Sequence, residues 1–289
     1  MLFHIQNQFL KVAVSDKGAE LMSILGIDGT EYLWQGDPTY WGDRAPNIFP
    51  YVARLTNGRY TYGGNTYSLP IHGFAPTAMY QVTEQLDDSI TFTLEDTPEF
   101  FEMYPFRFRF SIRYCLEGQN LRVQLLVENR DKKTMYFGLG GHPGINVPLE
   151  PGLKFEDYFL QFPDCDLRRV EFTETCFITG KEDPFPLEGG RLPLRHDMFD
   201  QDAIVLKGVP GRVTLTSDKG KHSVTLVAPD QGIYGFWHWP RTDAPYICLE
   251  PWSSLPSRQD VVEDLQTQPD LIALEAGKVY STIWSLEIE

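Results

Sequence analysis

Apolar and polar residues alternate along most of the chain in short runs with a period of two. In residues 106–116, four aromatic residues and Ile112 fall on one face, while three arginines and Ser111 fall on the other. This period is typical of a half-buried antiparallel strand, because successive side chains of a strand point to opposite faces. Similar runs occupy residues 9–15, 59–70, 120–129, 212–218 and 222–229.

Turn-forming residues separate these runs. Hairpin turns are predicted at Gly63-Gly64-Asn65, Leu116–Gln119, Val209-Pro210-Gly211 and Asp218-Lys219-Gly220. Helices are predicted only at 97–104 and 257–266, each with a Ser or Thr near its start as a cap. The charged segment 180–197 is predicted to be a long loop. With no linker or internal repeat, the pattern predicts an all-β fold: a single domain over residues 1–289, built as a large many-stranded antiparallel β-sandwich.

Composition and charge narrow the possible partners. The 289 residues carry a formal net charge of −15, which disfavours nucleic acid and anionic membranes. The first residues lack the pattern of a signal peptide, and no apolar run reaches the roughly 20 residues of a membrane span. The four cysteines (Cys115, Cys165, Cys176 and Cys248) are scattered, which is typical of reduced thiols. We therefore expect a cytoplasmic location.

Five polar or charged residues stand out from their surroundings. Arg54 lies in an apolar run, where it needs a partner unless it faces solvent. His72 precedes a glycine after a predicted strand end, and Asp202 leads into an apolar strand. A turn histidine and a capping aspartate would explain these two equally well. Glu250 ends an apolar run beside Trp252, which suits a carboxyl group with a perturbed pKa.

The fifth of these residues, His142, lies in an unusual stretch, GLGGHPGINVP, residues 138–148. Four glycines and two prolines exclude a helix and make a poor central strand. The stretch is either a turn with a surface histidine or a backbone that lets a ligand approach. No His/Cys/Asp/Glu spacing indicates a metal site. A glycosidase with Glu250 and Asp202 as paired carboxylates stays open, because sequence does not give their separation.

Several of these segments, taken in order, resemble the aldose 1-epimerase (galactose mutarotase) family, in particular its LacX-type branch of shorter bacterial proteins. The matching pieces are NIFPYVARLTNGRY (47–60), IHGFA (71–75), GGHPGINVP (140–148), FDQDAIVL (199–206) and ICLEPWSSLPS (247–257). The resemblance implies a galactose-mutarotase-like sandwich with a cleft on one face. It also implies interconversion of the α and β anomers of a hexose, with no metal or organic cofactor.

The resemblance also implies roles for individual residues. Glu250 matches the general base, His142 the general acid, and His72 a second histidine near the ring oxygen. The glycines around His142 would bring the backbone close to a pyranose. The remaining predicted substrate-binding residues are Arg54, Asp202, Trp239 and Asn47.

One position departs from the family pattern. Arginine commonly follows H-G-F-A in the family and helps relatives that act on hexose 6-phosphates to hold the phosphate, whereas this chain has Pro76. This difference and the negative net charge favour a free monosaccharide as the substrate, although Arg44 or Arg241 would be able to substitute. A hexose-6-phosphate mutarotase and a non-catalytic sugar-binding protein are the alternatives, and a homodimer is left open.

Overall fold

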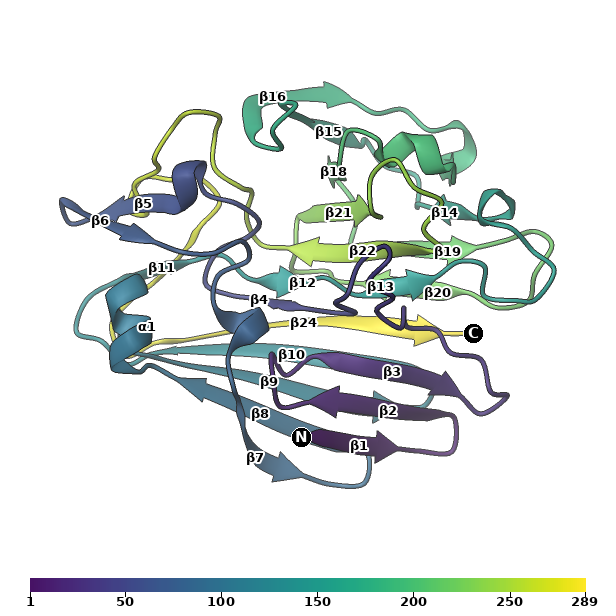
Figure 1. Cartoon of the computed structure of the whole chain (residues 1–289), viewed down its shortest axis with the longest axis horizontal. Coiled ribbons are helices and arrows are strands. Elements are labelled where there is room, and N and C mark those ends of the chain that lie inside the picture. Colours follow the sequence, from purple (N-terminus) through teal and green to yellow (C-terminus); the bar gives the residue numbers. More distant parts are fainter.

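The largest layer of the molecule is a nine-stranded antiparallel sheet. The computed structural model describes residues 1–289 (Figure 1). In spatial order this sheet contains β17 (Arg191–Pro193), β14 (Phe159–Gln161), β19 (Arg212–Thr216), β20 (Val224–Val227), β24 (Val279–Ile288), β10 (Asn120–Asn129), β9 (Phe108–Glu117), β8 (Ser89–Glu95) and β7 (Gln81–Gln85). The apolar face of β9 is buried, as the alternation in 106–116 predicts.

An eight-stranded sheet packs above the first one in the view of Figure 1. Its order is β16 (Ile178–Pro184), β15 (Arg168–Phe172), β18 (Ile204–Lys207), β21 (Ile233–Trp237), β22 (Tyr246–Trp252), β12 (Gly140–Gly141) and β4 (Asn47–Ile48), with β13 (Gly144–Asn146) also paired to β22. Strand β22 is buried on both faces. Ile247 and Leu249 join the main core, so the intervening residues point to the other face of the sheet.

Smaller elements surround the two large sheets. They are β1 (Leu2–Gln6), β2 (Leu10–Ser15) and β3 (Leu21–Gly26) in one sheet, the pairs β5 (Arg59–Tyr62) with β6 (Asn65–Ser68) and β11 (Met135–Phe137) with β23 (Ile272–Leu274), the helix α1 (Pro98–Met103), and the 3₁₀ turns η1 (Thr56–Gly58), η2 (Ala75–Thr77), η3 (Phe155–Asp157), η4 (Glu188–Gly190) and η5 (His196–Phe199). Helix α1 confirms the prediction for 97–104, since Thr97 caps it by accepting from the Phe100 amide. No helix has the length and apolar character needed to cross a membrane.

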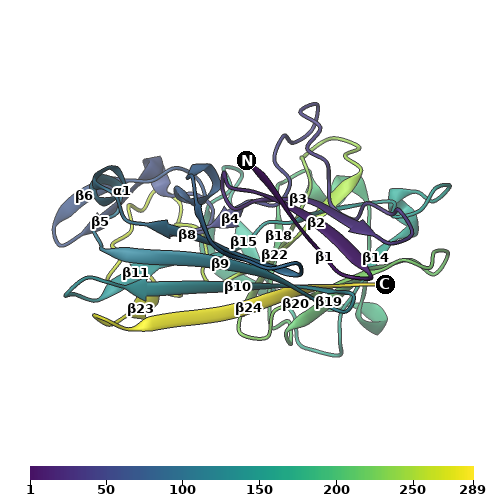
Figure 2. The ribbon, with the colours of Figure 1, turned by 90° about the horizontal axis from the view of Figure 1, so that it is seen from below.

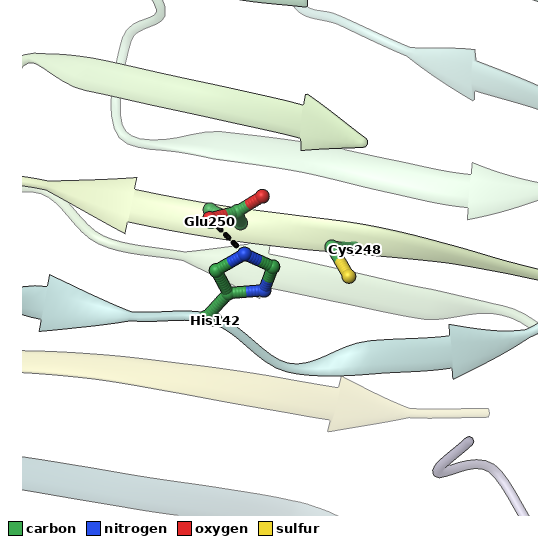
Figure 3. A group of neighbouring side chains, drawn as sticks. All are labelled: His142, Cys248 and Glu250. Carbon is green, nitrogen blue, oxygen red and sulfur yellow. Dashed lines mark ion pairs between the residues drawn. The ribbon is translucent and has the colours of Figure 1, made fainter. Parts of the chain in front are cut away.

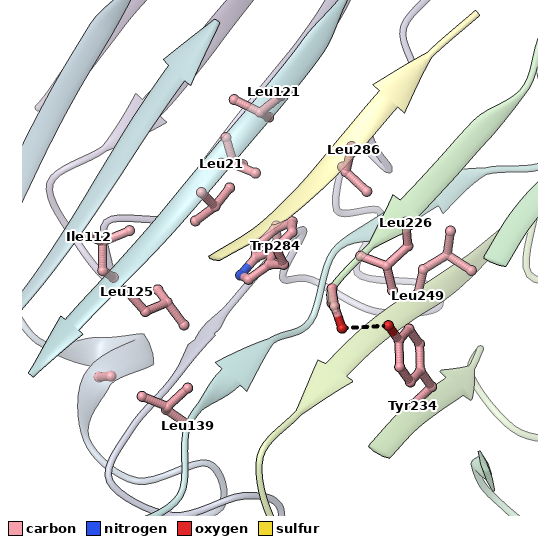
Figure 4. Packing of buried hydrophobic residues seen from close by; sticks show 14 of the residues in the cluster. Leu21, Ile112, Leu121, Leu125, Leu139, Leu226, Tyr234, Leu249, Trp284 and Leu286 are labelled. Carbon is pink, nitrogen blue, oxygen red and sulfur yellow. Dashed lines mark hydrogen bonds between the residues drawn. The ribbon is translucent and has the colours of Figure 1, made fainter. Parts of the chain in front are cut away.

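The main core lies between the two large sheets. Figure 4 shows leucines from β10, β20, β22 and β24 converging around Trp284. Figure 2, seen from below, shows the long strands of the nine-stranded sheet side by side in front of the other layer. The cluster contains 64 buried residues, enough apolar side chains to stabilise a chain of this size. The sheet content, the antiparallel pairing and this core confirm the predicted β-sandwich.

Three sequence predictions are wrong. Residues 257–266 form no helix, because Asp260 has φ +59° and the buried Glu263 carboxylate holds the Arg258 guanidinium at 2.9 Å. Val209–Gly211 does not close a hairpin but carries the chain from β18 in one sheet to β19 in the other. The segment 180–197 is not one loop, since it contains most of β16 and all of β17.

The stretch 138–148 is an inner part of the eight-stranded sheet. Almost all of it is buried, and β12 and β13 both pair with β22. Its glycines pack against the protein itself: a Cβ on Gly138 would lie 2.1 Å from Ser254 Oγ, and one on Gly141 would lie 2.7 Å from Trp284. The expectation that these glycines make room for a sugar is therefore corrected, because they let neighbouring strands and Trp284 approach closely.

This packing predicts that the Gly141→Ala substitution destabilises the protein. The added methyl group collides with the indole of Trp284 in a dense core, and such overpacking costs about 1–3 kcal/mol. Urea unfolding of both proteins measures the difference. Gly232→Ala is the matched control, because a Cβ there meets nothing within 4 Å. Equal unfolding free energies for Gly141→Ala and the wild type would contradict the packing described.

Candidate active site

Two titratable residues meet where β22 passes the stretch around His142. Strand β12 pairs with β22 at Gly140 and β13 pairs with it at Gly144, so His142, midway between them, faces the middle of β22. Glu250 lies at that point, with its Oε2 atom 3.1 Å from His142 Nε2. Sheet register thus brings together two residues that are more than a hundred positions apart in sequence.

The His142–Glu250 pair is buried and incompletely satisfied. His142 is 8% exposed and Glu250 is 1% exposed. His142 Nδ1 and Glu250 Oε2 have no hydrogen-bond partner, so the 3.1 Å contact lacks hydrogen-bond alignment. The Trp252 indole N–H is also unpartnered. Buried polar groups in folded proteins are nearly always paired, so these atoms indicate a place where a ligand completes the hydrogen bonding.

Burial shifts the two pKa values in opposite directions. Burial, with a smaller contribution from the negative charge of Asp202, raises the pKa of Glu250 well above its usual range. Burial, with the neighbouring His72 adding to it, lowers the pKa of His142 well below its usual range. Burial therefore favours the uncharged form of both groups, a carboxylic acid at Glu250 and a neutral imidazole at His142.

His72 approaches this pair with its ring held in one orientation. Its ring centroid lies 5.2 Å from that of His142, in an edge-to-face arrangement. The Ala53 N–H donates to His72 Nδ1 at 3.3 Å, which leaves the proton of the neutral ring on Nε2. Burial, followed by the charge of Arg54, lowers the pKa of His72 to about 4. Near neutral pH it is therefore an uncharged hydrogen-bond donor.

A charged pair lies beside the histidines. Arg54 Nη2 is 3.4 Å from Asp202 Oδ2, and the Ala203 N–H donates to Asp202 Oδ1 at 3.0 Å. The arginine side chain is 38% exposed, and its one hydrogen bond is that to Asp202, so its other donors remain free for a ligand. Both residues offer hydrogen bonds that suit hydroxyl groups.

Backbone strain gathers around the same place. Nine residues other than glycine have positive φ, and four of them line the cavity described next: Ala53, His72, Cys176 and Asp202. Such conformations cost of order 1–3 kcal/mol each and concentrate at functional sites. Gly73 also has φ +74°, and a Cβ there would lie 2.2 Å from the Phe49 carbonyl oxygen. This close approach explains the glycine that follows His72.

These residues line one cavity of about 560 Å³, a size typical of small-molecule sites. Of the residues predicted to bind or react, the structure brings six to its wall: Arg54, His72, His142, Asp202, Trp239 and Glu250. A larger hollow of about 990 Å³ follows β7–β10, but it is lined mainly by polar residues, and its arginines Arg109 and Arg113 are paired with glutamates. His142 and Glu250, each with a buried atom that lacks a hydrogen-bond partner, line the smaller cavity.

Aromatic residues form one side of the cavity. The Trp41 ring lies 5.0 Å from that of His142, and Trp237 lies 5.6 Å from it. Trp239, next to Trp237, is 45% exposed at the rim. Flat apolar faces beside polar groups suit the two faces of a sugar ring.

Asn47 is not brought to the cavity. It is buried on β4, and its amide donates to the Gly18 carbonyl at 3.0 Å and to the Tyr114 hydroxyl at 2.9 Å. Because these bonds occupy the amide group within the core, the predicted contact of Asn47 with a substrate is corrected. His238 is likewise a core residue, packed on Phe199.

Sequence reasoning missed three residues at or near this site: Trp41, Cys176 and Cys248. Trp41 has only the aromatic dipeptide Tyr40-Trp41 upstream of the NIFP segment as a signal. Cys248 lies two positions before Glu250, so both side chains point to the same face of β22. A ring nitrogen of His142, the Cys248 sulfur and a Glu250 oxygen all lie within 4.8 Å of one another (Figure 3). The spacing in the sequence had indicated no such cluster.

Comparisons with known proteins agree with this architecture. The family model for aldose 1-epimerase matches residues 1–285. The plasmid-encoded protein LacX of Lactococcus lactis subsp. lactis is 32% identical over 96% of this chain and 97% of its own length.

Two solved structures are similar over the whole chain. A galactose mutarotase related enzyme from Lactobacillus acidophilus has a TM-score of 0.95 and 34% identity, covering 100% of this chain and 97% of the other. A galactose mutarotase-like protein from Lactobacillus casei ATCC 334 has a TM-score of 0.95 and 32% identity, covering 100% of both chains.

Proposed function

Because the chain belongs to the aldose 1-epimerase family, we propose that it interconverts the α and β anomers of a free hexose in the cavity around His142 and Glu250. The observation that carries this proposal is the buried contact of 3.1 Å between His142 Nε2 and Glu250 Oε2, with His142 Nδ1 and Glu250 Oε2 lacking hydrogen-bond partners. A protein that only bound sugar would not need an acid and a base in contact.

The reaction requires one base and one acid at a single acetal centre. The base removes the proton from the C1 hydroxyl while the acid protonates the ring oxygen, and the bond between C1 and the ring oxygen breaks to give the open aldehyde. Rotation about the C1–C2 bond presents the other face of the aldehyde. The two proton transfers then reverse, and the ring closes as the opposite anomer.

Glu250 is proposed as the base and His142 as the acid. Ring opening moves one proton onto the carboxylate and one off the imidazolium, so the pair holds one proton in total before and after each step. Burial favours the uncharged forms of both residues, which are their state after ring opening. The ionised pair that begins the reaction therefore has to form by transfer of one proton from Glu250 to His142. The 3.1 Å contact between the two side chains gives that proton a direct route. At ring closure Glu250 returns a proton to the C1 oxygen and His142 takes one back from the ring oxygen, so both residues regain their starting states.

The neighbouring residues are proposed to hold the sugar. His72 presents its Nε2 proton near the ring oxygen, and Arg54 and Asp202 bind hydroxyl groups. Trp239 gives a flat surface for the ring. Fixing the hydroxyls keeps the open chain in place, so that it closes again instead of leaving.

The proposal is tested on freshly dissolved α-glucose and α-galactose. Polarimetry, or proton NMR at C1, follows the approach to anomeric equilibrium with and without the protein. We expect the protein to accelerate the approach for at least one sugar without changing the final ratio. No acceleration with either sugar, together with measurable sugar binding, would favour the non-catalytic alternative.

The charges of the cavity predict a preference for the free sugar over its 6-phosphate. Arg54 is its single arginine or lysine and is paired with Asp202, whereas Asp43 adds negative charge. Arg44 is turned away, donating to Gln35 at 2.8 Å. A phosphate dianion without a cationic partner is costly to bury. We expect kcat/KM to be higher for glucose or galactose, with a gap that narrows at high salt.

A single substitution tests the preference for the free sugar by adding a cationic partner for phosphate. Pro76 lines the cavity, so Pro76→Arg supplies a partner for phosphate and should raise kcat/KM for the 6-phosphate selectively. Ile27→Arg is the matched control, because it makes the same change of net charge at a site that is 75% exposed and outside the cavity. A wild-type preference for the 6-phosphate that weakens with salt would overturn this substrate assignment.

A further inference from the structure

Three potential metal ligands lie together at the cavity, and acid–base catalysis does not account for all of them. His142, Cys248 and Glu250 offer an imidazole nitrogen, a thiol sulfur and a carboxylate oxygen, all within 4.8 Å of one another. Cys248 is 0% exposed and is not part of the cavity wall. Each of these three donor types, nitrogen, sulfur and oxygen, is one that Zn²⁺ takes in proteins.

We propose that His142, Cys248 and Glu250 form a zinc site that overlaps the proposed acid–base pair, and that Zn²⁺ bound there inhibits the enzyme reversibly. The binding site stands on the three side chains alone, whereas inhibition rests on the proposed function. Zinc would occupy His142 Nε2 and a Glu250 oxygen, the atoms between which the proton has to move.

The distances fit a small tetrahedral ion. Zinc binds nitrogen and oxygen at about 2.0–2.2 Å and sulfur at about 2.3 Å, which places tetrahedral donors roughly 3.3–3.6 Å apart. His142 Nε2 and Glu250 Oε2 are already 3.1 Å apart. Rotation of the Cys248 side chain needs to bring its sulfur closer by only about 1 Å from the 4.8 Å limit.

The cavity gives the ion access to these residues, and the negative charge of the protein attracts it. His142 and Glu250 line the cavity, so an ion reaches them from solvent and meets Cys248 behind them. Glu250 Oε2 is without a hydrogen-bond partner and is therefore free to ligate. The negative net charge raises the local concentration of cations. On coordination the thiol gives its proton to solvent and becomes the thiolate ligand. Three protein ligands leave the fourth position to water.

The site is tested with the full-length protein freed of metal by a chelator. Calorimetric titration with Zn²⁺ measures affinity and stoichiometry, and Co²⁺ serves as a spectroscopic probe of thiolate ligation. We expect one ion per chain, a thiolate-to-cobalt charge-transfer band in the near ultraviolet, and loss of anomer exchange that a chelator restores.

Cysteine variants identify the ligand. In Cys248→Ala the charge-transfer band should disappear, and Zn²⁺ affinity should fall by more than the roughly 10–100-fold that loss of an outer-shell partner costs. Cys115→Ala is the matched control, because that thiol lies on β9, away from the cavity, and both signals should persist. Cys248→Ser serves the same purpose if the alanine variant does not fold.

The outcomes separate the two proposals. A charge-transfer band that survives in Cys248→Ala, or no saturable Zn²⁺ binding by the wild type, would overturn the zinc site. Binding through Cys248 in a protein that does not exchange anomers would overturn the proposed function and leave the zinc site standing. Exchange that continues in the zinc-loaded protein would show that the ion does not block the acid–base pair.

Discussion

The Glu250→Gln variant is expected to lose anomer exchange by roughly 10²–10⁴-fold, the usual contribution of a positioned base. The amide has nearly the same shape as the carboxyl group but cannot accept the proton from the C1 hydroxyl. Glu250 is buried and its pKa is raised, so the site already tolerates an uncharged side chain there. The fold and sugar binding should therefore survive the change.

Initial rates by polarimetry, unfolding in urea and sugar binding by calorimetry test this expectation together. Glu84→Gln is the matched control, since it makes the same chemical change at a carboxylate 49% exposed on the outer sheet face. Near-native exchange by Glu250→Gln would show that this carboxylate is not the base. Loss of the fold would instead assign Glu250 a structural role.

The His142→Asn variant should lower kcat by roughly 10²-fold or more while changing KM much less. Protonation of the ring oxygen develops mainly in the transition state, so removing the acid weakens transition-state binding more than substrate binding. Asparagine keeps a polar side chain in the buried position but supplies no proton. Steady-state rates over a range of sugar concentrations separate kcat from KM.

The kinetics of His72→Asn should differ from those of His142→Asn. His72 is a neutral donor near neutral pH, because its pKa is about 4, and it is proposed to bind the sugar near the ring oxygen. Its loss should therefore raise KM as well as lower kcat. A pure binding defect in His142→Asn, with kcat unchanged, would exchange the roles of the two histidines.

The fold was largely predictable because period two is strong wherever one face of a strand is buried. Strand β9 shows this, with its aromatic residues inward and its arginines outward. The edge strand β16 was missed because most of its side chains are exposed and show no alternation. The segment 257–266 has helix-forming residues, but distant partners decide its conformation: the Thr61 N–H donates to the Glu263 carbonyl at 2.8 Å, and the Gln259 N–H donates to the Ile178 carbonyl at 3.1 Å.

The sequence allowed prediction of those site residues that local sequence features mark. His72, His142 and Glu250 stood out because glycine and proline surround them or because they interrupt apolar runs. The residues that surround them in space are set by strand pairing, which cannot be seen in the sequence. Sheet register places Cys248 beside His142, and the glycines near His142 fit Trp284 of a distant strand. Asn47 was predicted to bind the substrate, but its amide N–H group donates to the Gly18 carbonyl within the core.

The central claim is that Glu250 and His142 act as one proton-exchanging unit. A double-mutant cycle on the rate of anomer exchange, with the wild type, Glu250→Gln, His142→Asn and the double variant, tests it most directly. Residues that act as a unit show strongly non-additive losses. The double variant should therefore be no slower than the slower single variant. A loss in the double variant equal to the product of the two single losses would show that the residues act independently and would contradict the claim.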